Sequence, residues 1–267
     1  MSHHIIEMED LHYGYPDGTQ VLQGISFRIT HGEKVALVGA NGAGKSTLLL
    51  QLNGCLLPDS GRVRIGELPV TKKTLTHVRR TVGLVFQDPD DQLFMPLVYD
   101  DVAFGPLNLG LTPEEVESQV MRALAAVGAV HLKDRPPYHL SGGEKRAVAI
   151  AAVLSLTPAI LVMDEPTSNL DPRTRRQLIE LLKTFDHSLI IATHDMDMVL
   201  DLCPRTLVLK EGRIIADGPT PKIMQDEDLL ASCSLEKPLR MQGCPVCNPA
   251  DPGPMAGAVA GMDQKER

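Results

Sequence analysis

A glycine-rich loop directly after a short apolar strand constrains this chain more than any other feature. Residues 39–47 read Gly-Ala-Asn-Gly-Ala-Gly-Lys-Ser-Thr, and the apolar run Lys34–Val38 precedes them. In such a unit the glycines let the backbone point its amide hydrogens inward, and the dipole of the following helix attracts phosphate. The lysine would contact the β and γ phosphates, the serine would hold Mg²⁺, and the threonine lies near the α phosphate. We therefore predict a nucleoside triphosphate site. Its loop residues are Gly39, Asn41, Gly42, Gly44, Lys45, Ser46 and Thr47.

The composition fits one compact α/β unit and argues against several other classes. With 267 residues and 43% hydrophobic content, the chain can bury a substantial core without disulfide or metal staples. A formal net charge of −8 disfavours a broad nucleic-acid-binding face, so we expect no nucleic acid partner. No apolar stretch approaches the roughly 18 to 20 residues that span a bilayer. We expect the chain to stay in the cytosol, where its five cysteines would be reduced.

The order of strand and helix patterns predicts two β layers. Short β-type patterns at Ile5–Leu11 and Val21–Thr30 flank a Tyr-Pro-Asp-Gly turn, which indicates antiparallel strands ahead of the phosphate loop. Further strand patterns at Val82–Phe86, Ile160–Met163 and Ser188–Thr193 are separated by helical stretches, as expected of a parallel sheet. We therefore predict an α/β fold, with a P-loop NTPase core and an N-terminal antiparallel β-subdomain.

Two changes of composition suggest the domain limits. From about residue 93 to 156 helix formers prevail, with Thr112 as an N-cap and Pro113 after it, so we expect an inserted α-helical subdomain. After about residue 232 Pro, Gly, Ala and Met dominate without a hydrophobic period. We expect a nucleotide-binding domain over 1–232 and a flexible tail over 233–267. Cys244 and Cys247 in that tail have metal or redox spacing, and the alternative is two free thiols.

Polar side chains follow three of the predicted strands. Asp164 and Glu165 come directly after an apolar run, and the carboxyl ends of parallel strands form the functional edge of a sheet. We expect Asp164 to hold Mg²⁺ through its water shell and Glu165 to accept a proton from the attacking water. Gln87 could touch both the metal and the water through its amide. His194 could hydrogen-bond the γ phosphate.

A second helix start is also suited to anions. Ser141 is a good N-cap, and Gly142 and Gly143 after it expose their backbone amides. A bound triphosphate has few oxygens left for a second such terminus in the same chain. A dimer, in which the terminus serves the other subunit, would explain why both occur.

Six motifs in their order along the chain resemble those of the ATP-binding cassette (ABC) family. Over about Ile5–Met224 they are the phosphate loop, Gln87, Leu140–Glu144, Leu161–Glu165, Ser168–Asp171 and His194. The resemblance implies that two subunits face each other, with Ser141–Gly143 of one closing over the triphosphate held by Lys45 of the other. It implies that Asp171 links the two sites across the seam. It also implies that Tyr15, or else Tyr13, stacks on adenine; the alternative is a tyrosine that only packs a turn.

A narrower resemblance is to the ATPase subunits of energy-coupling factor importers, particularly the cobalt or nickel type. It rests on Phe86–Phe94, Val98–Pro106 and Asn108–Leu111. It implies a peripheral protein at the cytoplasmic face of the inner membrane, using ATP and Mg²⁺. Its partners would be integral membrane coupling and substrate-binding proteins and a second ABC ATPase subunit, a homodimer being favoured over a heterodimer. Cobalt is the favoured cargo, then nickel, then a vitamin such as biotin.

One apolar segment beside Gln87 has two interpretations. It could form a groove for a short cytoplasmic helix of a membrane partner, or it could merely pack the helical insert. Its residues are Leu93, Phe94, Met95, Leu97 and Val98.

The main rival to a transport function is a soluble cassette ATPase acting on ribosomes or DNA. ATPases of this family that act on ribosomes usually carry two cassettes in one chain. Those that act on DNA carry a long coiled-coil insertion. This chain has one cassette and a modest insert, which favours transport. A small-molecule phosphotransferase with a phosphate loop would not explain Leu140–Glu144 or the Asp171 loop.

Overall fold

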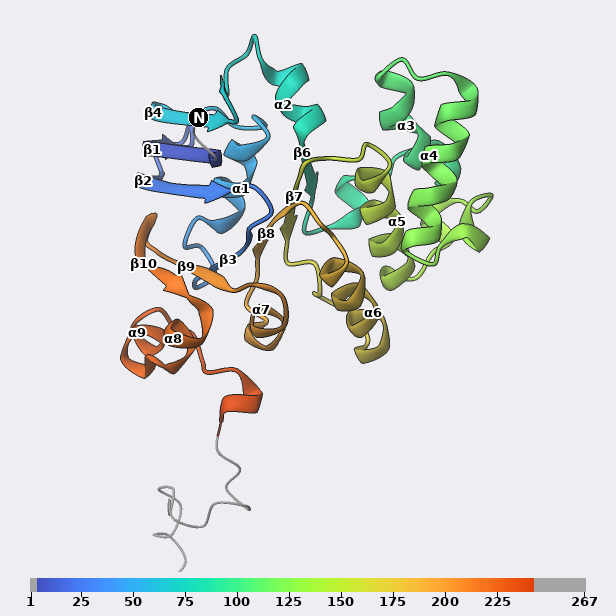
Figure 1. Cartoon of the computed structure of the whole chain (residues 1–267). Helices are drawn as coiled ribbons and strands as arrows, with labels where there is room; N and C mark the ends of the chain where they lie inside the picture. The colour runs from blue at the N-terminus through green and yellow to red at the C-terminus, as the bar shows by residue number, and fades with distance from the viewer. Residues whose placement is uncertain (1–3, 243–267) are drawn as a thin grey trace, which may run out of the picture.

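The computed structural model describes residues 4–242, which form two β layers surrounded by helices (Figure 1). The antiparallel sheet consists of β2 (Gln20–Thr30), β1 (His4–Gly14), β4 (Ser60–Ile65) and β5 (Leu68–Pro69), in that spatial order. The six-stranded sheet consists of β10 (Arg213–Pro219), β9 (Arg205–Lys210), β3 (Lys34–Val38), β8 (Ser188–Ala192), β7 (Ile160–Asp164) and β6 (Val82–Val85). Its strands are parallel except for the edge strand β10. These layers confirm the predicted α/β class with its N-terminal antiparallel sheet.

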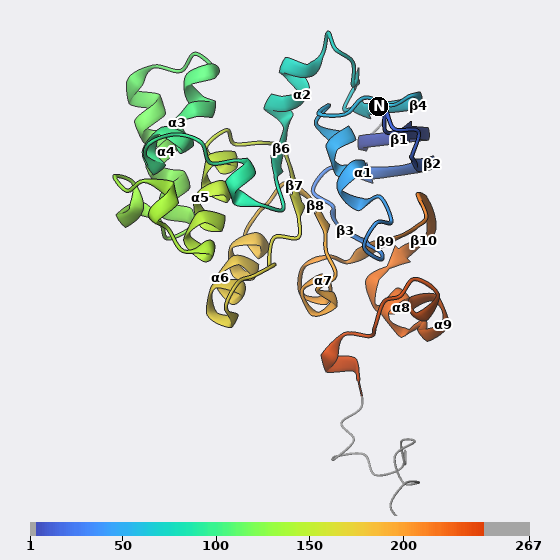
Figure 2. The ribbon, with the colours of Figure 1, turned by 180° about the vertical axis from the view of Figure 1, so that it is seen from behind.

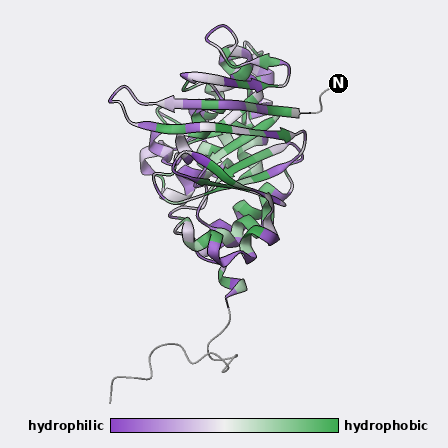
Figure 3. Ribbon diagram, turned by 90° about the vertical axis from the view of Figure 1, so that its left-hand side faces the viewer, coloured by the Kyte–Doolittle hydropathy of each residue, from purple (hydrophilic) through white to green (hydrophobic). Residues whose placement is uncertain are grey.

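The burial of the strands follows from what covers each sheet. Every residue of β6, β7 and β8 is buried, because a parallel sheet has other elements on both faces. The strand β2 instead alternates buried and exposed residues over its second half, as expected where one face meets water. Figure 3 shows the predominantly hydrophobic strands in the middle of the molecule. The functional loops therefore start from a rigid, fully packed sheet.

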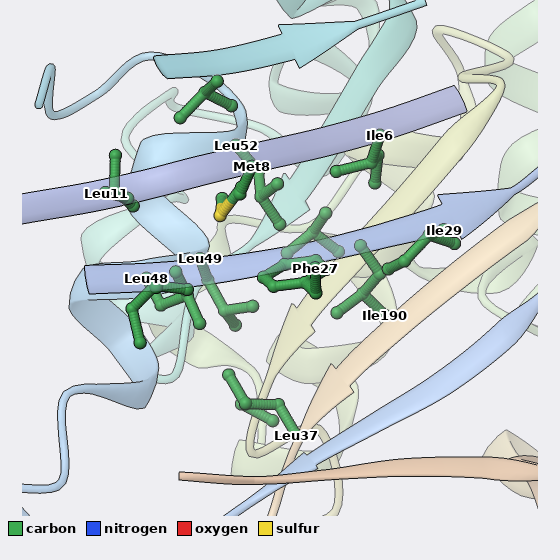
Figure 4. Close-up of a cluster of buried hydrophobic side chains, with 14 of the residues drawn as sticks. Ile6, Met8, Leu11, Phe27, Ile29, Leu37, Leu48, Leu49, Leu52 and Ile190 are labelled. Carbon is green, nitrogen blue, oxygen red and sulfur yellow. The ribbon is translucent and has the colours of Figure 1, made fainter. Parts of the chain in front are cut away.

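The helix after the phosphate loop, α1 (Lys45–Leu52), is fixed by packing between the sheets. Apolar side chains of β1, β2, β3, β8 and α1 point toward one another in a single buried cluster (Figure 4). The leucines that α1 contributes are Leu48, Leu49 and Leu52, all almost fully buried. Truncating one such leucine to alanine typically costs about 2–5 kcal/mol. The position of the phosphate loop thus depends on the main core.

Three helices form a separate apolar cluster on one side of the molecule. They are α3 (Val98–Asn108), α4 (Pro113–Ala126) and α5 (Gly142–Leu154). Figures 1 and 2 show them at the opposite side from the antiparallel sheet. The predicted N-cap at Thr112 is present, and its hydroxyl and the Glu115 carboxylate form a capping box. The three helices confirm the inserted helical subdomain, whose limits at 93 and 156 stay a prediction.

The remaining helices complete the cover of the six-stranded sheet. They are α2 (Leu75–Thr81), α6 (Pro172–Lys183), α7 (Met196–Leu202), α8 (Thr220–Gln225) and α9 (Glu227–Ser232). Except for α6, each has six or seven residues, too few for a helical period to be read from the sequence. Within residues 4–242, no helix is both long and apolar enough to cross a membrane.

The chain stays packed for some distance beyond the residue where we expected a flexible tail. Cys233 and Leu235 are buried in the core cluster that lies under α7 and α8. Arg240 forms ion pairs with Asp197 at 3.3 Å and Asp201 at 2.9 Å, both on α7. Apolar burial and these charges hold the first ten residues after Ser232. The rest of the expected tail, including Cys244 and Cys247, lies outside the described residues.

Candidate active site

The loops that follow β3, β6, β7 and β8 meet at the carboxyl edge of the six-stranded sheet. They enclose a cleft of about 500 Å³. Its lining residues are Tyr15, Val21, Asn41, Gly42, Gly44, Lys45, Ser46, Thr47, Gln87, Asp164, Glu165 and His194. The structure thus brings together most of the residues that the sequence predicts for the site. Five predicted site residues are not on this lining: Gly39, Ser141, Gly142, Gly143 and Asp171.

The phosphate loop owes its shape to glycines with distinct roles. A Cβ on Gly39 would lie 2.2 Å from the carbonyl oxygen of Leu209, so only glycine fits against β9. Gly44 has a φ of 105°, which side chains disfavour, and the helix α1 begins directly after it. The buried Lys45 donates hydrogen bonds from Nζ to Gly39 O at 2.8 Å and Ala40 O at 3.1 Å. Its ammonium therefore lies within the loop, where phosphate oxygens can replace these two carbonyls.

The carboxylate of Asp164 suits a hydrated divalent cation. Its Oδ1 is buried and has no hydrogen-bond partner within the described part of the chain. Burial raises the pKa of Asp164, and the charge of Glu165 adds to this, whereas Ser46, Lys45 and Arg146 oppose it. An unpartnered buried oxygen beside a serine hydroxyl is what the oxygen-rich coordination of Mg²⁺ requires. No group of three or more His, Cys, Asp or Glu in residues 4–242 could hold a metal. The phosphates would have to supply the remaining ligands.

Glu165 is held by the loop after β8. Its backbone has a φ of 45°, and its N–H donates to Ala192 O at 2.8 Å. Its Oε2 accepts from Thr193 Oγ1 at 3.0 Å and from the backbone N–H of His194 at 3.3 Å, and lies 2.9 Å from His194 Nδ1. The sequence analysis missed Thr193. A hydroxyl directly before the histidine, at the end of a buried strand, was the available signal.

Side chains of α5 hold the backbone at Gln87 in place. The guanidinium of Arg146 donates to Phe86 O at 2.6 Å and also to Gln87 O. Lys145 forms an ion pair with Asp90 at 2.6 Å. Both cations lie in the first turns of α5, where Glu144 separates them from the glycines at 142 and 143. The sequence analysis did not identify these links, although adjacent cations opposite an acidic turn were a signal.

The start of α5 is a capping box whose glycines the fold itself does not require. Ser141 Oγ donates to Glu144 Oε2 at 2.8 Å, and the backbone N–H of Ser141 donates to the same oxygen at 2.7 Å. These hydrogen bonds lower the pKa of Glu144. A Cβ on Gly142 would meet no atom within 4 Å. The predicted N-cap is therefore present, and the exposed Gly142 beside it has open space in which an anion could lie.

Two further predicted contacts have a clear local setting. Asp171 is the N-cap of α6, and its Oδ1 accepts from Arg173 N at 2.9 Å and Thr174 N at 3.1 Å. The hydroxyl groups of Tyr15 and Thr47 are 3.1 Å apart at the cleft. Tyr15 is 38% exposed, whereas Tyr13 is only 8% exposed and lies in the main core. This geometry favours Tyr15 over Tyr13 as the adenine contact.

Comparison with known proteins identifies the family. The family model described as ABC transporter matches residues 22–168, more than half of the chain. The chain belongs to the ABC transporter family. A putative ABC transporter ATP-binding protein of Geobacter sulfurreducens is 67% identical to this ABC ATPase, over 92% of this chain and 99% of the relative. The energy-coupling factor transporter ATP-binding protein EcfA of Methanocaldococcus jannaschii is 48% identical, over 88% of this chain and 86% of the relative.

Solved structures show the same fold. The structure of cbiO1 of Clostridium perfringens, described as part of the ABC transporter complex cbiONQ, has a TM-score of 0.76 and 42% identity. It covers 86% of this chain and 94% of its own. A dimeric ATP-binding cassette in a post-hydrolysis state, bound to ADP and Pi, has a TM-score of 0.74 and 26% identity, over 80% and 98% of the two chains. The ABC ATPase described above is therefore an ATP-binding enzyme that hydrolyses ATP, and its resemblance to energy-coupling factor ATPases is supported.

Proposed function

We propose that this ABC ATPase powers the import of a transition-metal ion, cobalt first and nickel next, as a subunit of an energy-coupling factor transporter. The identity with EcfA and the likeness to cbiO1, named as part of a transporter complex, support this role. A vitamin such as biotin is the alternative cargo. The chain would act at the cytoplasmic face of the inner membrane, bound to integral membrane coupling and substrate-binding proteins.

Each residue of the cleft has a proposed role in hydrolysis. Lys45 and the loop amides bind the β and γ phosphates, and Tyr15 stacks on adenine. Glu165 accepts the proton of the attacking water, and His194 donates to the γ phosphate. Gln87 orients that water through its amide. Mg²⁺ held near Ser46, Gln87 and Asp164 supplies charge stabilisation when bound. Except for Tyr15, which follows β1 of the antiparallel sheet, these residues belong to the loops at one edge of the six-stranded sheet or directly adjoin them, and this convergence is the observation that supports the hydrolytic mechanism best.

The site of one chain is completed by a second copy. Gly142 is exposed and a Cβ added there would meet no atom within 4 Å, yet none of Ser141, Gly142 and Gly143 is on the lining of the cleft that contains Lys45. In a homodimer the start of α5 of one copy would close over the triphosphate of the other. Asp171, exposed at the start of α6, would then contact the facing site across the seam.

An exposed aromatic pair near Gln87 supports the membrane partnership. Phe94 is 65% exposed and Phe104 is 44% exposed, and their ring centroids are 5.0 Å apart. Leu93 and Val98 are buried and pack the helical insert, so only the exposed part of this segment is open to a partner. Asp101 Oδ1 accepts from the N–H groups of Phe94 at 3.0 Å and Met95 at 3.1 Å, which fixes the aromatic edge. We propose that a short apolar helix of the coupling protein docks here.

The test is a purification from native membranes. The tagged Glu165→Gln chain is solubilised in detergent with ATP and Mg²⁺, and its stoichiometric companions are identified by mass spectrometry. Companions with several membrane spans would support the transporter and narrow its cargo. Recovery from the soluble fraction alone, with ribosomal or DNA-associated proteins, would contradict the transporter role and leave the ATPase intact. A Lys45→Ala sample prepared in parallel controls for companions that do not depend on bound nucleotide.

A further inference from the structure

The carboxylate of Asp195 joins three segments behind the active site. Arg175 on α6 donates to it from Nε at 2.6 Å and from Nη2 at 2.8 Å, so the pair is bidentate. Thr167, two residues after Glu165, donates from Oγ1 at 3.2 Å. The backbone N–H of Met198 donates at 3.0 Å, which makes Asp195 the N-cap of α7. The loop after β7, the helix α6 and the helix α7 therefore share one carboxylate.

A chain of hydrogen bonds connects Asp195 to Glu165 through the hydroxyl of Thr193. The backbone N–H of Asp195 donates to Thr193 Oγ1 at 3.0 Å, and the same hydroxyl donates to Glu165 Oε2 at 3.0 Å. Burial alone would raise the pKa of Asp195, but the hydrogen bonds from Arg175 and Met198 outweigh it and lower that pKa. The carboxylate thus stays ionised and paired while the neighbouring hydroxyl aims at Glu165.

The other end of the connection lies at Asp171. The backbone N–H of Arg175 donates to Asp171 O at 2.9 Å, in the first turn of α6. The helices α6 and α7 also contact each other, and Figure 1 shows them on the same side of the six-stranded sheet. Because a helix is rigid over one turn, a displacement of Asp171 moves the guanidinium of Arg175 as well. The ion pair would carry such a movement to the loop that contains Thr193 and His194.

We propose that Arg175 and Asp195 are positioning residues that fix the partners of Glu165 relative to the start of α6. The inference rests on the proposed catalytic role of Glu165 and on Asp171 lying at a seam between copies. Neither residue touches nucleotide in this assignment. They set the hydroxyl of Thr193 and the ring of His194 against the carboxylate that accepts the proton. If the ion pair between Arg175 and Asp195 is broken, we expect ATP to bind as before but the carboxylate of Glu165 to be misplaced.

The test separates turnover from binding and from folding. Asparagine caps helices as well as aspartate, so Asp195→Asn keeps the cap of α7 and weakens the pairing with the guanidinium, together with the hydrogen bond from Thr167. We expect Asp195→Asn and Arg175→Ala each to lower kcat roughly 10- to 100-fold, the range that a small misplacement of a catalytic group produces. The Kd for a fluorescent ATP analogue should stay nearly unchanged. Arg175→Lys, which keeps the charge without the fork, should recover part of the lost kcat.

A double-mutant cycle and matched controls complete the design. The Arg175→Ala, Asp195→Asn double variant should lose no more kcat than the worse single variant, because both break one interaction. Arg176→Ala, on the same helix with an exposed side chain, should retain wild-type kcat. Unchanged kcat in both single variants would overturn the proposal, and so would additive losses in which melting temperature and nucleotide affinity fall together. Full turnover of Glu165→Gln would instead refute the proposed base and not the ion pair.

Discussion

The ring nitrogen Nδ1 of His194 lies 2.9 Å from Oε2 of Glu165. The two side chains differ sharply in exposure, because the imidazole is 67% exposed and the carboxylate only 7%. The carboxylate is also the acceptor for Thr193, so side chains and backbone of the protein itself orient it. The histidine can therefore meet an incoming γ phosphate while the proton acceptor stays shielded from bulk water.

The first prediction concerns the proton acceptor. Glu165→Gln should bind ATP with nearly wild-type affinity but lose turnover by about 100-fold or more, because an amide cannot take the proton of the attacking water. Steady-state phosphate release and nucleotide titration measure the two properties separately. Glu236→Gln, at an exposed position, is the matched control. Turnover close to that of the wild type would assign the base to another residue.

A second prediction separates stacking from hydrogen bonding at Tyr15. Tyr15→Phe keeps the ring and removes only the hydroxyl that meets Thr47 at 3.1 Å, so ATP affinity should change little. Tyr15→Ala should weaken ATP binding by about 1 kcal/mol, which is close to fivefold in Kd. Titration with ATP and with inorganic triphosphate checks the assignment, since only the nucleotide has a base to stack. Equal losses for both ligands would contradict the adenine contact.

A third prediction links the metal ligand to stability. Burial raises the folded-state pKa of Asp164 above its ordinary value of 3.8, so its contribution to stability is full below that pH and is lost as pH rises through the folded pKa. At neutral pH and without Mg²⁺, the buried charge destabilises the chain. Asp164→Asn should therefore raise the melting temperature at neutral pH, and the gain should shrink below pH 3.8.

The same variant should fail in function. With Mg²⁺ and ATP the wild type should gain stability, and Asp164→Asn should gain much less and should not turn over. Thermal melts across pH, with and without the metal, measure this. Asp186→Asn, at an exposed turn, is the control and should show no gain. A variant less stable than the wild type in metal-free buffer would show that Ser46, Lys45 and Arg146 outweigh the effect of burial on the Asp164 carboxylate.

A fourth prediction concerns the aromatic edge of the helical subdomain. Phe94→Ala and Phe104→Ala should leave the ATPase activity of the purified chain unchanged, because neither residue lines the nucleotide cleft. Both should reduce recovery of membrane companions with the tagged chain, since a buried aromatic anchor typically contributes about 2 kcal/mol or more to an interface. Ile215→Ala, which removes exposed apolar surface on β10, should keep the companions. If only the Ile215 variant loses its companions, the docking site lies at β10 and not at the aromatic pair.

The sequence predicted the part of the site that depends on strand ends. Lys45, Gln87, Glu165 and His194 follow four strands, and the carboxyl ends of parallel strands meet at one edge, so their convergence in the cleft was foreseeable. The catalytic and binding roles of these residues stay predictions. The order of the strands within the sheet was not foreseeable, because each strand shows only that it is buried.

The supporting contacts could not be predicted, because their partners lie far apart in the chain. Arg146 meets Phe86 across 60 residues, and Arg175 meets Asp195 across 20. A charged residue in an amphipathic helix usually faces water, so adjacent cations such as Lys145 and Arg146 are a signal that does not name the partner they meet. Buried cysteine and leucine after Ser232 were missed for a related reason. Their short segment has no period, and only the finished core explains their burial.

The open space at Gly142 has a consequence for cells that make two versions of the chain. Since a Cβ added there meets no atom within 4 Å, Gly142→Glu should fold and be produced like the wild type. Its carboxylate would repel the triphosphate of any copy it pairs with. In the proposed homodimer, such a subunit would still pair with a normal subunit and inactivate it, so the substitution would be dominant-negative. A substitution that prevents folding would instead be recessive.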